Sequence, residues 1–237
     1  MVLLDLVKHL RQSLLDDTGG SNVSWEDIVE DTASEAQLRW SNEELTRFIN
    51  EAEKQACRSA LLLKSADPTF SITVVAGTAT YSLDSRIIKI KGIYLSSSGR
   101  ELIKTDYEDL LPMGDWRSKT GIPTHYIEDI ESGDITLYPK PSANDTLNLL
   151  VYRLPMVPMS WDLAEIDTPD IKEEHQLAML NYAAFLAYNK DEANTFDPQR
   201  AEYYRQLFVQ EFSNTSAYSE IRQTRTRNRT VRYRDVL

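Results

Sequence analysis

The hydrophobic period of this 237-residue chain changes twice along its length. Apolar residues recur every three or four positions from about residue 42 to 64, alternate in short runs from about 70 to 154, and recur every three or four positions again from about 170 to 212. A period near 3.6 indicates an amphipathic helix, whereas a period near 2 indicates a half-buried strand. The order predicts helices, a β module and helices again, which is an α+β fold.

Two helices are expected before the β module. Residues 1–15 carry leucines at helical spacing, and the polar stretch 21–39 is expected to be mostly loop. Ser41 and Glu44 match a capping box, in which a hydroxyl and a carboxylate satisfy free amides at a helix start. The box predicts a helix from about residue 42 to 64, which Pro68 prevents from continuing.

Two further helices are expected after the β module. One runs from about residue 170 to 189, and its predicted apolar face includes His175, Tyr182 and Phe185. The other starts at Asp197-Pro198, where an N-cap residue is followed by proline at the first helical position. Its apolar stripe ends at about residue 212, so we expect the chain beyond to be extended.

About six short strands, separated by Gly, Pro, Asn and Asp, fill the region between the helical parts. They predict an antiparallel β domain. Neither helical half has much core alone, so we expect both halves to pack together as a helical bundle that carries the β domain as an insertion. The predicted domains are a bundle of residues 1–66 and 159–212, a β domain of residues 67–158, and a basic C-terminal docking arm of residues 213–237.

Charge separates the C-terminal end from the rest of the chain. The formal net charge is −11, but the last 17 residues hold six arginines, no lysine and one acid, so residues 1–220 carry −16. The arginines are Arg222, Arg225, Arg227, Arg229, Arg232 and Arg234. Arginine favours paired hydrogen bonds to carboxylates or phosphates, and 17 extended residues reach about 55 Å. This pattern predicts a protein-docking arm; the alternatives are nucleic-acid binding and a solvated terminus without a binding role.

Signatures of catalysis and metal binding are missing from the sequence. It contains no phosphate-binding loop, no GxGxxG, no GxSxG and no HExxH. Cys57 is the only cysteine, which excludes an intrachain disulfide and a cysteine-based zinc site. No apolar run reaches the roughly 18 residues of a membrane helix, and no secretory signal is recognised. We therefore expect a cytoplasmic, non-enzymatic protein without cofactor or metal.

Several stretches, taken in order, resemble the head-to-tail adaptor proteins of tailed bacteriophages, also called connector or head completion proteins. The stretches are LTRFINEAEKQACRSALL at 45–62, GIPTHYIED at 121–129, GDITLYPKP at 133–141, LNLLVYRLP at 147–155 and EHQLAMLNYAAFLAYNKDEANTFDPQRAEYYRQLF at 174–208. The resemblance covers about residues 40 to 212. None of these stretches is a catalytic signature.

The resemblance implies a structural virion protein that assembles as a twelve-subunit ring on the portal protein. Such a ring extends the DNA channel, joins the capsid to the tail, and lies at the portal vertex after assembly in the host cytoplasm. Double-stranded DNA passes through it without sequence-specific binding, which suits an acidic channel. The alternative is an acidic DNA-associated regulator that uses the arginine tail on DNA.

The resemblance also suggests binding residues. The C-terminal arginines and Tyr233 are the expected portal-binding residues. Tyr107, Met113 and Trp116 lie in the loop-rich middle of the β module. They are expected to be core residues, and their alternative role is to bind a tail or nozzle protein.

Overall fold

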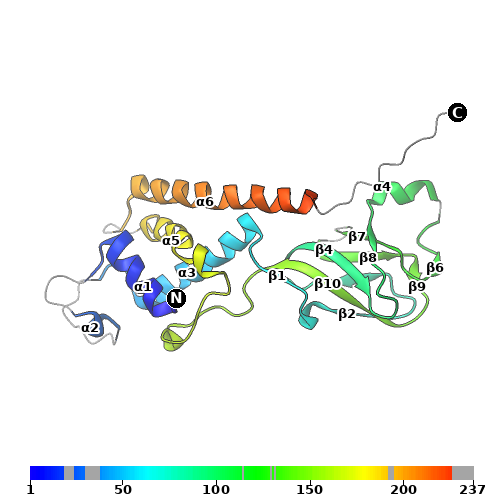
Figure 1. The fold of residues 1–237 in the computed structure, drawn as a ribbon, viewed down its shortest axis with the longest axis horizontal. Coiled ribbons are helices and arrows are strands. Elements are labelled where there is room, and N and C mark those ends of the chain that lie inside the picture. The colour runs from blue at the N-terminus through cyan, green and yellow to red at the C-terminus, as the bar shows by residue number, and fades with distance from the viewer. Residues whose placement is uncertain are drawn as a thin grey trace. The chain divides into compact units, whose positions relative to one another are not determined.

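The computed structural model describes most of the chain and divides into two compact units (Figure 1). The described residues are 1–18, 24–29, 38–113, 115–128, 130, 132–191 and 195–225. One unit, here called the helical unit, consists of Met1–Leu62 and Pro155–Leu237, and the other, the β unit, consists of Leu63–Leu154. The chain thus leaves the helical unit once and returns to it once.

The helical unit is built from segments at both ends of the chain. Its elements are α1 (Leu3–His9), the π-helical turn η1 (Leu10–Leu15), α2 (Trp25–Val29), α3 (Asn42–Ala60), the 3-10 turn η4 (Trp161–Leu163), α5 (Glu173–Tyr188) and α6 (Pro198–Arg225). The predicted N-cap of α3 is confirmed, because Ser41 Oγ accepts a hydrogen bond from the Glu44 amide at 3.1 Å. The helix ends at Ala60, earlier than predicted, because Leu61 adopts a left-handed conformation with φ of 52°.

Helices α3 and α5 pack together through small side chains. Ala52 and Ala56 on α3 and Ala183, Ala184 and Ala187 on α5 have no exposed surface. Alanine allows close approach of two helix axes, so this face of α5 is the deeply buried one. The predicted face of α5 was wrong in this respect: His175, Tyr182 and Phe185 are half-buried. A helix that is apolar on all sides gives no periodic signal that singles out one face.

Helix α6 is longer than its apolar stripe. The expectation of an extended chain from residue 213 is wrong for residues 213–225, where α6 continues to Arg225. The extension contains good helix formers such as Ala217, Glu220 and Gln223, which prolong a helix without an apolar stripe. Residues 226–237 lie outside the described part of the chain.

The β unit contains three small sheets. Its elements are β1 (Lys64–Ser65), η2 (Pro68–Phe70), β2 (Ile72–Val74), β3 (Thr80–Ser82), β4 (Ile87–Leu95), β5 (Ile103–Lys104), α4 (Tyr107–Leu110), η3 (Leu111–Met113), β6 (Thr120–Gly121), β7 (His125–Glu128), β8 (Asp134–Tyr138), β9 (Lys140–Pro141) and β10 (Asp145–Arg153). Strand β10 pairs with β4 along most of its length and with β1 and β2 near its two ends. A second sheet has the order β3-β8-β7-β5, and β6 pairs with β9.

The prediction of an antiparallel domain holds for most of the strand pairs, but two short pairs depart from it. Strand β5 pairs with β7 in parallel, and β6 pairs with β9 in parallel. Parallel neighbours need a long connection, and the segment that carries α4 and η3 provides one between β5 and β7. The unit is therefore a mixed β domain.

Candidate docking surfaces

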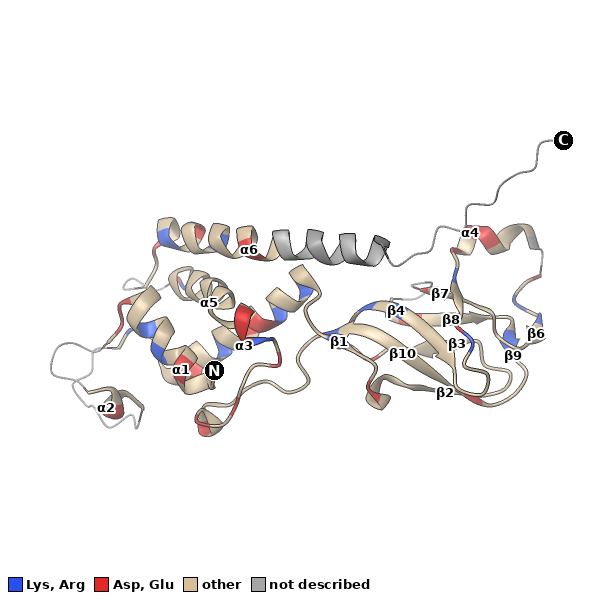
Figure 2. Cartoon of the chain, viewed as in Figure 1, with Lys and Arg blue, Asp and Glu red and all other residues tan. Residues whose placement is uncertain are grey.

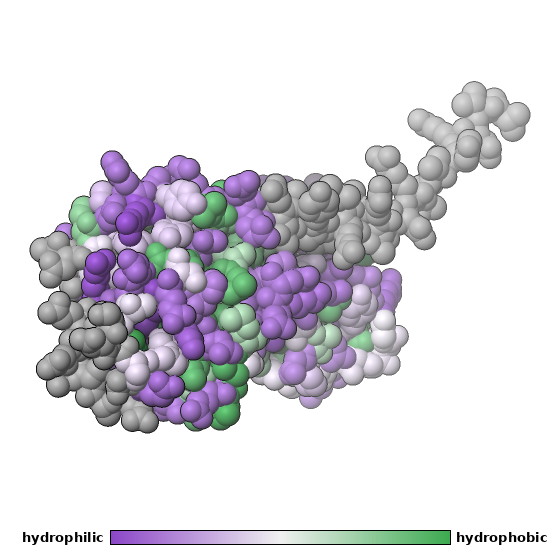
Figure 3. All heavy atoms as spheres, turned by 60° about the vertical axis from the view of Figure 1, so that its left-hand side comes forward, coloured by the Kyte–Doolittle hydropathy of each residue, from purple (hydrophilic) through white to green (hydrophobic). Residues whose placement is uncertain are grey.

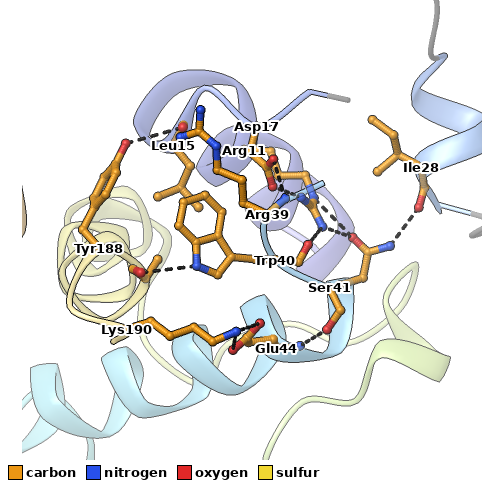
Figure 4. A network of polar contacts seen from close by, with 12 residues as sticks. Arg11, Leu15, Asp17, Ile28, Arg39, Trp40, Ser41, Glu44, Tyr188 and Lys190 are labelled. Atoms are coloured by element: carbon orange, nitrogen blue, oxygen red, sulfur yellow. Dashed lines mark hydrogen bonds and ion pairs between the residues drawn. The ribbon is translucent and has the colours of Figure 1, made fainter. Parts of the chain in front are cut away.

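A buried ion pair lies at the base of the segment that connects η1 to α3 (Figure 4). The Arg11 side chain has no exposed surface, and its guanidinium donates to Asp17 Oδ2 at 2.5 Å, to the Trp40 carbonyl at 2.7 Å and to Asn42 Oδ1 at 2.8 Å. Burial lowers the pKa of Arg11, whereas the charge of Asp17 opposes that shift. The guanidinium thus donates to Asp17 at the start of the connecting segment and to Trp40 and Asn42 at its end.

Further hydrogen bonds connect this ion pair to neighbouring elements. Asp17 Oδ1 accepts from the Arg39 amide at 3.0 Å, and Asn42 Nδ2 donates to the Ile28 carbonyl of α2 at 2.8 Å. The indole of Trp40 donates to the Ala187 carbonyl of α5 at 3.3 Å. This network is structural, because it is enclosed and its acceptors are satisfied within the chain. The network was not predicted, because its residues follow no motif and lie up to 147 positions apart in the sequence.

A groove with an aromatic floor lies between α3, α5 and α6. Its volume is about 530 Å³, and its lining residues are Gln55, Ser59, Tyr182, Phe185, Arg205, Phe208, Val209, Phe212 and Ser213. The ring centroids of Tyr182 and Phe208 lie 5.0 Å apart, and those of Phe208 and Phe212 lie 4.6 Å apart. We call this the aromatic groove.

The edge of the aromatic groove combines one apolar and several polar side chains. Val209 on α6 is 49% exposed, and Arg205 is paired with Glu202 on the same helix at 2.7 Å. An apolar floor with a polar edge is the composition of surfaces that bind protein partners. The aromatic residues of the groove were predicted only as parts of apolar helix faces. The groove itself was therefore not predicted.

A second apolar surface of the helical unit lies in the segment between β10 and α5. Val157 is 74% exposed, Ile166 is 71% exposed and Leu163 is 48% exposed. Figure 3 shows hydrophobic atoms gathered at the lower edge of the molecule, where Figure 1 shows this segment in yellow-green. Asp162 and Glu165 lie between the apolar residues in the sequence. We call Val157, Leu163 and Ile166 the apolar segment.

The β unit holds the residues that were suggested for tail binding. Trp116 is 7% exposed and is buried with Leu110, Ile127 and Tyr138. Tyr107 is 38% exposed and meets the Trp116 ring edge-on at a centroid distance of 6.0 Å. Trp116 is therefore a core residue, whereas Tyr107 reaches the surface; the side chain of Met113 lies outside the described residues.

An acidic pocket lies beside Tyr107. Its volume is about 470 Å³, and its lining residues are Asp106, Tyr107, Glu108, Arg117, Ile127, Glu128 and Ile130. Glu128 pairs with Lys104, and its Oε1 atom is buried with no hydrogen-bond partner among the described residues. Burial, with Glu128 and Glu101 nearby, raises the pKa of Tyr126 to about 12. The pocket lining thus carries three carboxylates and one guanidinium.

The charged residues are distributed unevenly between the two units (Figure 2). Residues 1–62 and 155–220 contain 24 acidic and 10 basic residues, whereas residues 63–154 contain 12 acidic and 10 basic residues. Of the arginines expected to bind the portal, Arg222 and Arg225 belong to the last turns of α6. Arg227, Arg229, Arg232, Tyr233 and Arg234 lie outside the described residues.

The described residues offer no metal centre. They contain no group of three or more His, Cys, Asp and Glu side chains that could hold a metal ion. His125 hydrogen-bonds the neighbouring Thr124 at 2.8 Å, and His175 lies beside the Phe212 ring. In this part of the chain no helix combines the length and the apolar character that a membrane span requires.

Comparison with known proteins gives one family. The family model described as SU10 adaptor protein matches residues 1–234. No curated protein matches the chain significantly.

Proposed function

Because this chain belongs to the SU10 adaptor protein family, a phage head-to-tail adaptor family, we propose that it forms a ring beneath the portal. In this proposal the ring extends the DNA channel and joins the capsid to the tail, and its symmetry is twelve-fold, to match the portal. The family match over 234 of the 237 residues is the observation that carries the proposal. A structural role in the virion, at the head-tail junction, follows from the family itself.

The charge of the helical unit supports a role beside DNA that does not involve binding it. Residues 1–62 and 155–220 carry 14 more acidic than basic residues. A channel lined by such a surface repels phosphates, so a duplex can slide through it without being held. The nearly balanced charge of the β unit gives no comparable repulsion, and we place the helical unit next to the DNA.

The C-terminal arginines are the proposed contact with the portal protein. Arg222 and Arg225 belong to the last turns of α6, and the twelve residues that follow carry four more arginines. Guanidinium groups form paired hydrogen bonds with carboxylates, which fix orientation as well as position. An acidic surface of the portal is therefore the proposed partner of this arm.

The surface around Tyr107 is the proposed contact with a tail or nozzle protein. Tyr107 is the first residue of α4, is partly exposed and lines the acidic pocket. Leu111 directly follows α4 and is 52% exposed. Aromatic residues at a surface with a nearby pocket are frequent anchors in protein interfaces. A tail protein with a basic side chain at its surface would fit this site.

Cosedimentation with the portal ring of the same phage tests the proposal. In the test variant Arg227, Arg229, Arg232 and Arg234 are replaced by Gln, which leaves α6 intact. In a matched control the exposed Lys64, Lys89, Arg100 and Lys119 of the β unit are replaced by Gln, so that both variants lose four positive charges.

We expect the unaltered chain and the control to bind the portal and form rings visible by electron microscopy, and the test variant to bind weakly. Equal binding by both variants would show that the arm is not the portal contact. Failure of the unaltered chain to bind the portal would overturn the adaptor proposal.

A further inference from the structure

We propose that the aromatic groove of one copy receives the apolar segment of the next copy. This inference rests on the proposed ring, and it names the surfaces that would connect neighbouring subunits. The groove is bounded by α3, α5 and α6, whereas Val157, Leu163 and Ile166 belong to the segment between β10 and α5. Each copy therefore carries both halves of the contact.

Both surfaces are open in the single chain. Val157 and Ile166 have the highest exposed fractions among the described large apolar residues, at 74% and 71%. The groove has room for about 530 Å³, enough to take aliphatic side chains, and its floor is made of Tyr182, Phe185, Phe208 and Phe212. Aliphatic side chains packed on aromatic rings bury apolar surface from both partners. The two surfaces thus match in chemistry.

Two different surfaces that bind each other produce a head-to-tail contact. In such an interface the second copy still presents a free groove, so a third copy can bind. The series closes into a ring when the rotation between copies divides a full turn evenly, and otherwise it continues as an open filament. A contact between two identical patches would stop at a dimer. The proposed ring requires two unlike surfaces of this kind on each copy, and the helical unit carries both.

Charge complements the apolar match. Asp162 and Glu165 accompany the apolar segment. Arg205 lies at the groove and pairs with Glu202 of its own helix, and Arg58, one residue before the groove residue Ser59, pairs with Glu51. Both arginines are about half exposed at their side chains, at 49% and 46%. Opposite charges around an apolar contact steer association and fix its register.

Cysteine cross-linking tests the pairing directly. The double variant Ile166→Cys, Val209→Cys is assembled and treated with a short thiol-to-thiol cross-linker, and the two single variants serve as controls. The native Cys57 has no exposed surface, so it does not compete for the reagent.

The double variant should give a ladder of covalent multimers on a denaturing gel. Each single variant should give none, and a mixture of the two single variants should give dimers only. Absence of the ladder in the double variant, or cross-linked dimers in a single variant, would overturn the proposed pairing.

A charge placed in the groove provides the second test. Val209→Glu should weaken subunit association by about 30-fold or more, the effect of a hot-spot residue. The matched control is Leu177→Glu, because Leu177 is 46% exposed and does not line the groove. Association is measured by analytical ultracentrifugation, and circular dichroism verifies that both variants are folded. An equal effect of both substitutions would contradict the pairing.

The two proposals can fail separately. If the unaltered chain forms rings on the portal but the double variant gives no ladder, the adaptor function stands and this interface is wrong. If the ladder forms but the chain does not bind the portal, the interface stands and the portal function is wrong.

Discussion

At the scale of single residues, the Arg11–Asp17 pair is a buried ion pair within a hydrogen-bond network. The two side chains are 0% and 2% exposed, so water does not solvate their charges. Each charge is stabilised by the other and by the hydrogen bonds around it. Burial of two charges costs several kcal/mol per ion, and only good geometry with additional hydrogen bonds offsets this cost. Here the carbonyl of Trp40 and the amide of Asn42 provide those bonds.

Replacement of Arg11 by Met should lower the free energy of unfolding by about 3–5 kcal/mol, because Asp17 is left as an uncompensated buried charge. Urea denaturation followed by circular dichroism measures the loss. The double variant Arg11→Met, Asp17→Leu should recover part of it, since no charge then remains buried.

The control is the exposed pair Arg58–Glu51, whose side chains are 46% and 43% exposed. Arg58→Met should change the unfolding free energy by at most about 1 kcal/mol, the range of surface ion pairs. If Arg11→Met proved no more destabilising than Arg58→Met, the buried network would have no special role in stability.

At the scale of elements, the contact between α3 and α5 depends on small side chains. Ala183 is fully buried on α5, and Ala52 and Ala56 are fully buried on α3. Ala183→Leu should lower the free energy of unfolding by about 1–3 kcal/mol, because the added carbons force the closely packed helices apart.

Ala178→Leu is the matched control, because Ala178 lies on the same helix and is only half-buried. Thermal denaturation of both variants and the unaltered chain measures the difference in melting temperature. Equal melting temperatures for the two variants would show that α3 and α5 tolerate a larger separation.

The elements also show how far the sequence predicts this fold. The N-cap at Ser41 placed the start of α3 correctly, because capping is a local interaction between neighbouring residues. The Glu44 carboxylate of the predicted capping box pairs instead with Lys190, just after the end of the distant helix α5. The main strands were located from their period of 2, but the parallel pairing of β5 with β7 depends on residues far apart in the sequence. Local patterns thus identify elements, and pairing requires the tertiary structure.

The candidate surfaces were harder to predict than the elements. Tyr182, Phe208 and Phe212 belong to apolar stripes, and a stripe that lines an open groove has the same spacing as one in a closed core. The exposure of Val157 and Ile166 likewise depends on the tertiary structure, because the sequence does not show that no other element packs on them. For Trp116, the expectation of a core position agrees with its burial.

At the scale of the whole molecule, three parts of the chain differ in net charge. The helical unit up to residue 220 is strongly acidic, the β unit is nearly balanced, and the last 17 residues are strongly basic. An acidic body repels DNA phosphates, whereas a cluster of arginines attracts them, so the two effects oppose each other wherever a duplex approaches. The net charge of −11 indicates that repulsion prevails for the isolated chain.

Binding of the unaltered chain to a short DNA duplex distinguishes the adaptor from the DNA-associated regulator. We expect the dissociation constant to be weaker than about 10⁻⁴ M at physiological salt, the weak end of ordinary non-specific binding. Fluorescence anisotropy of a labelled duplex at several salt concentrations measures it, and the control is a variant with all six C-terminal arginines replaced by Gln. If the arginines neutralised six phosphates, the logarithm of the binding constant would fall with the logarithm of salt with a slope of about −5, and the control would lose this dependence. That result would favour the regulator, because the adaptor proposal assigns these arginines to an acidic surface of the portal and not to DNA phosphates.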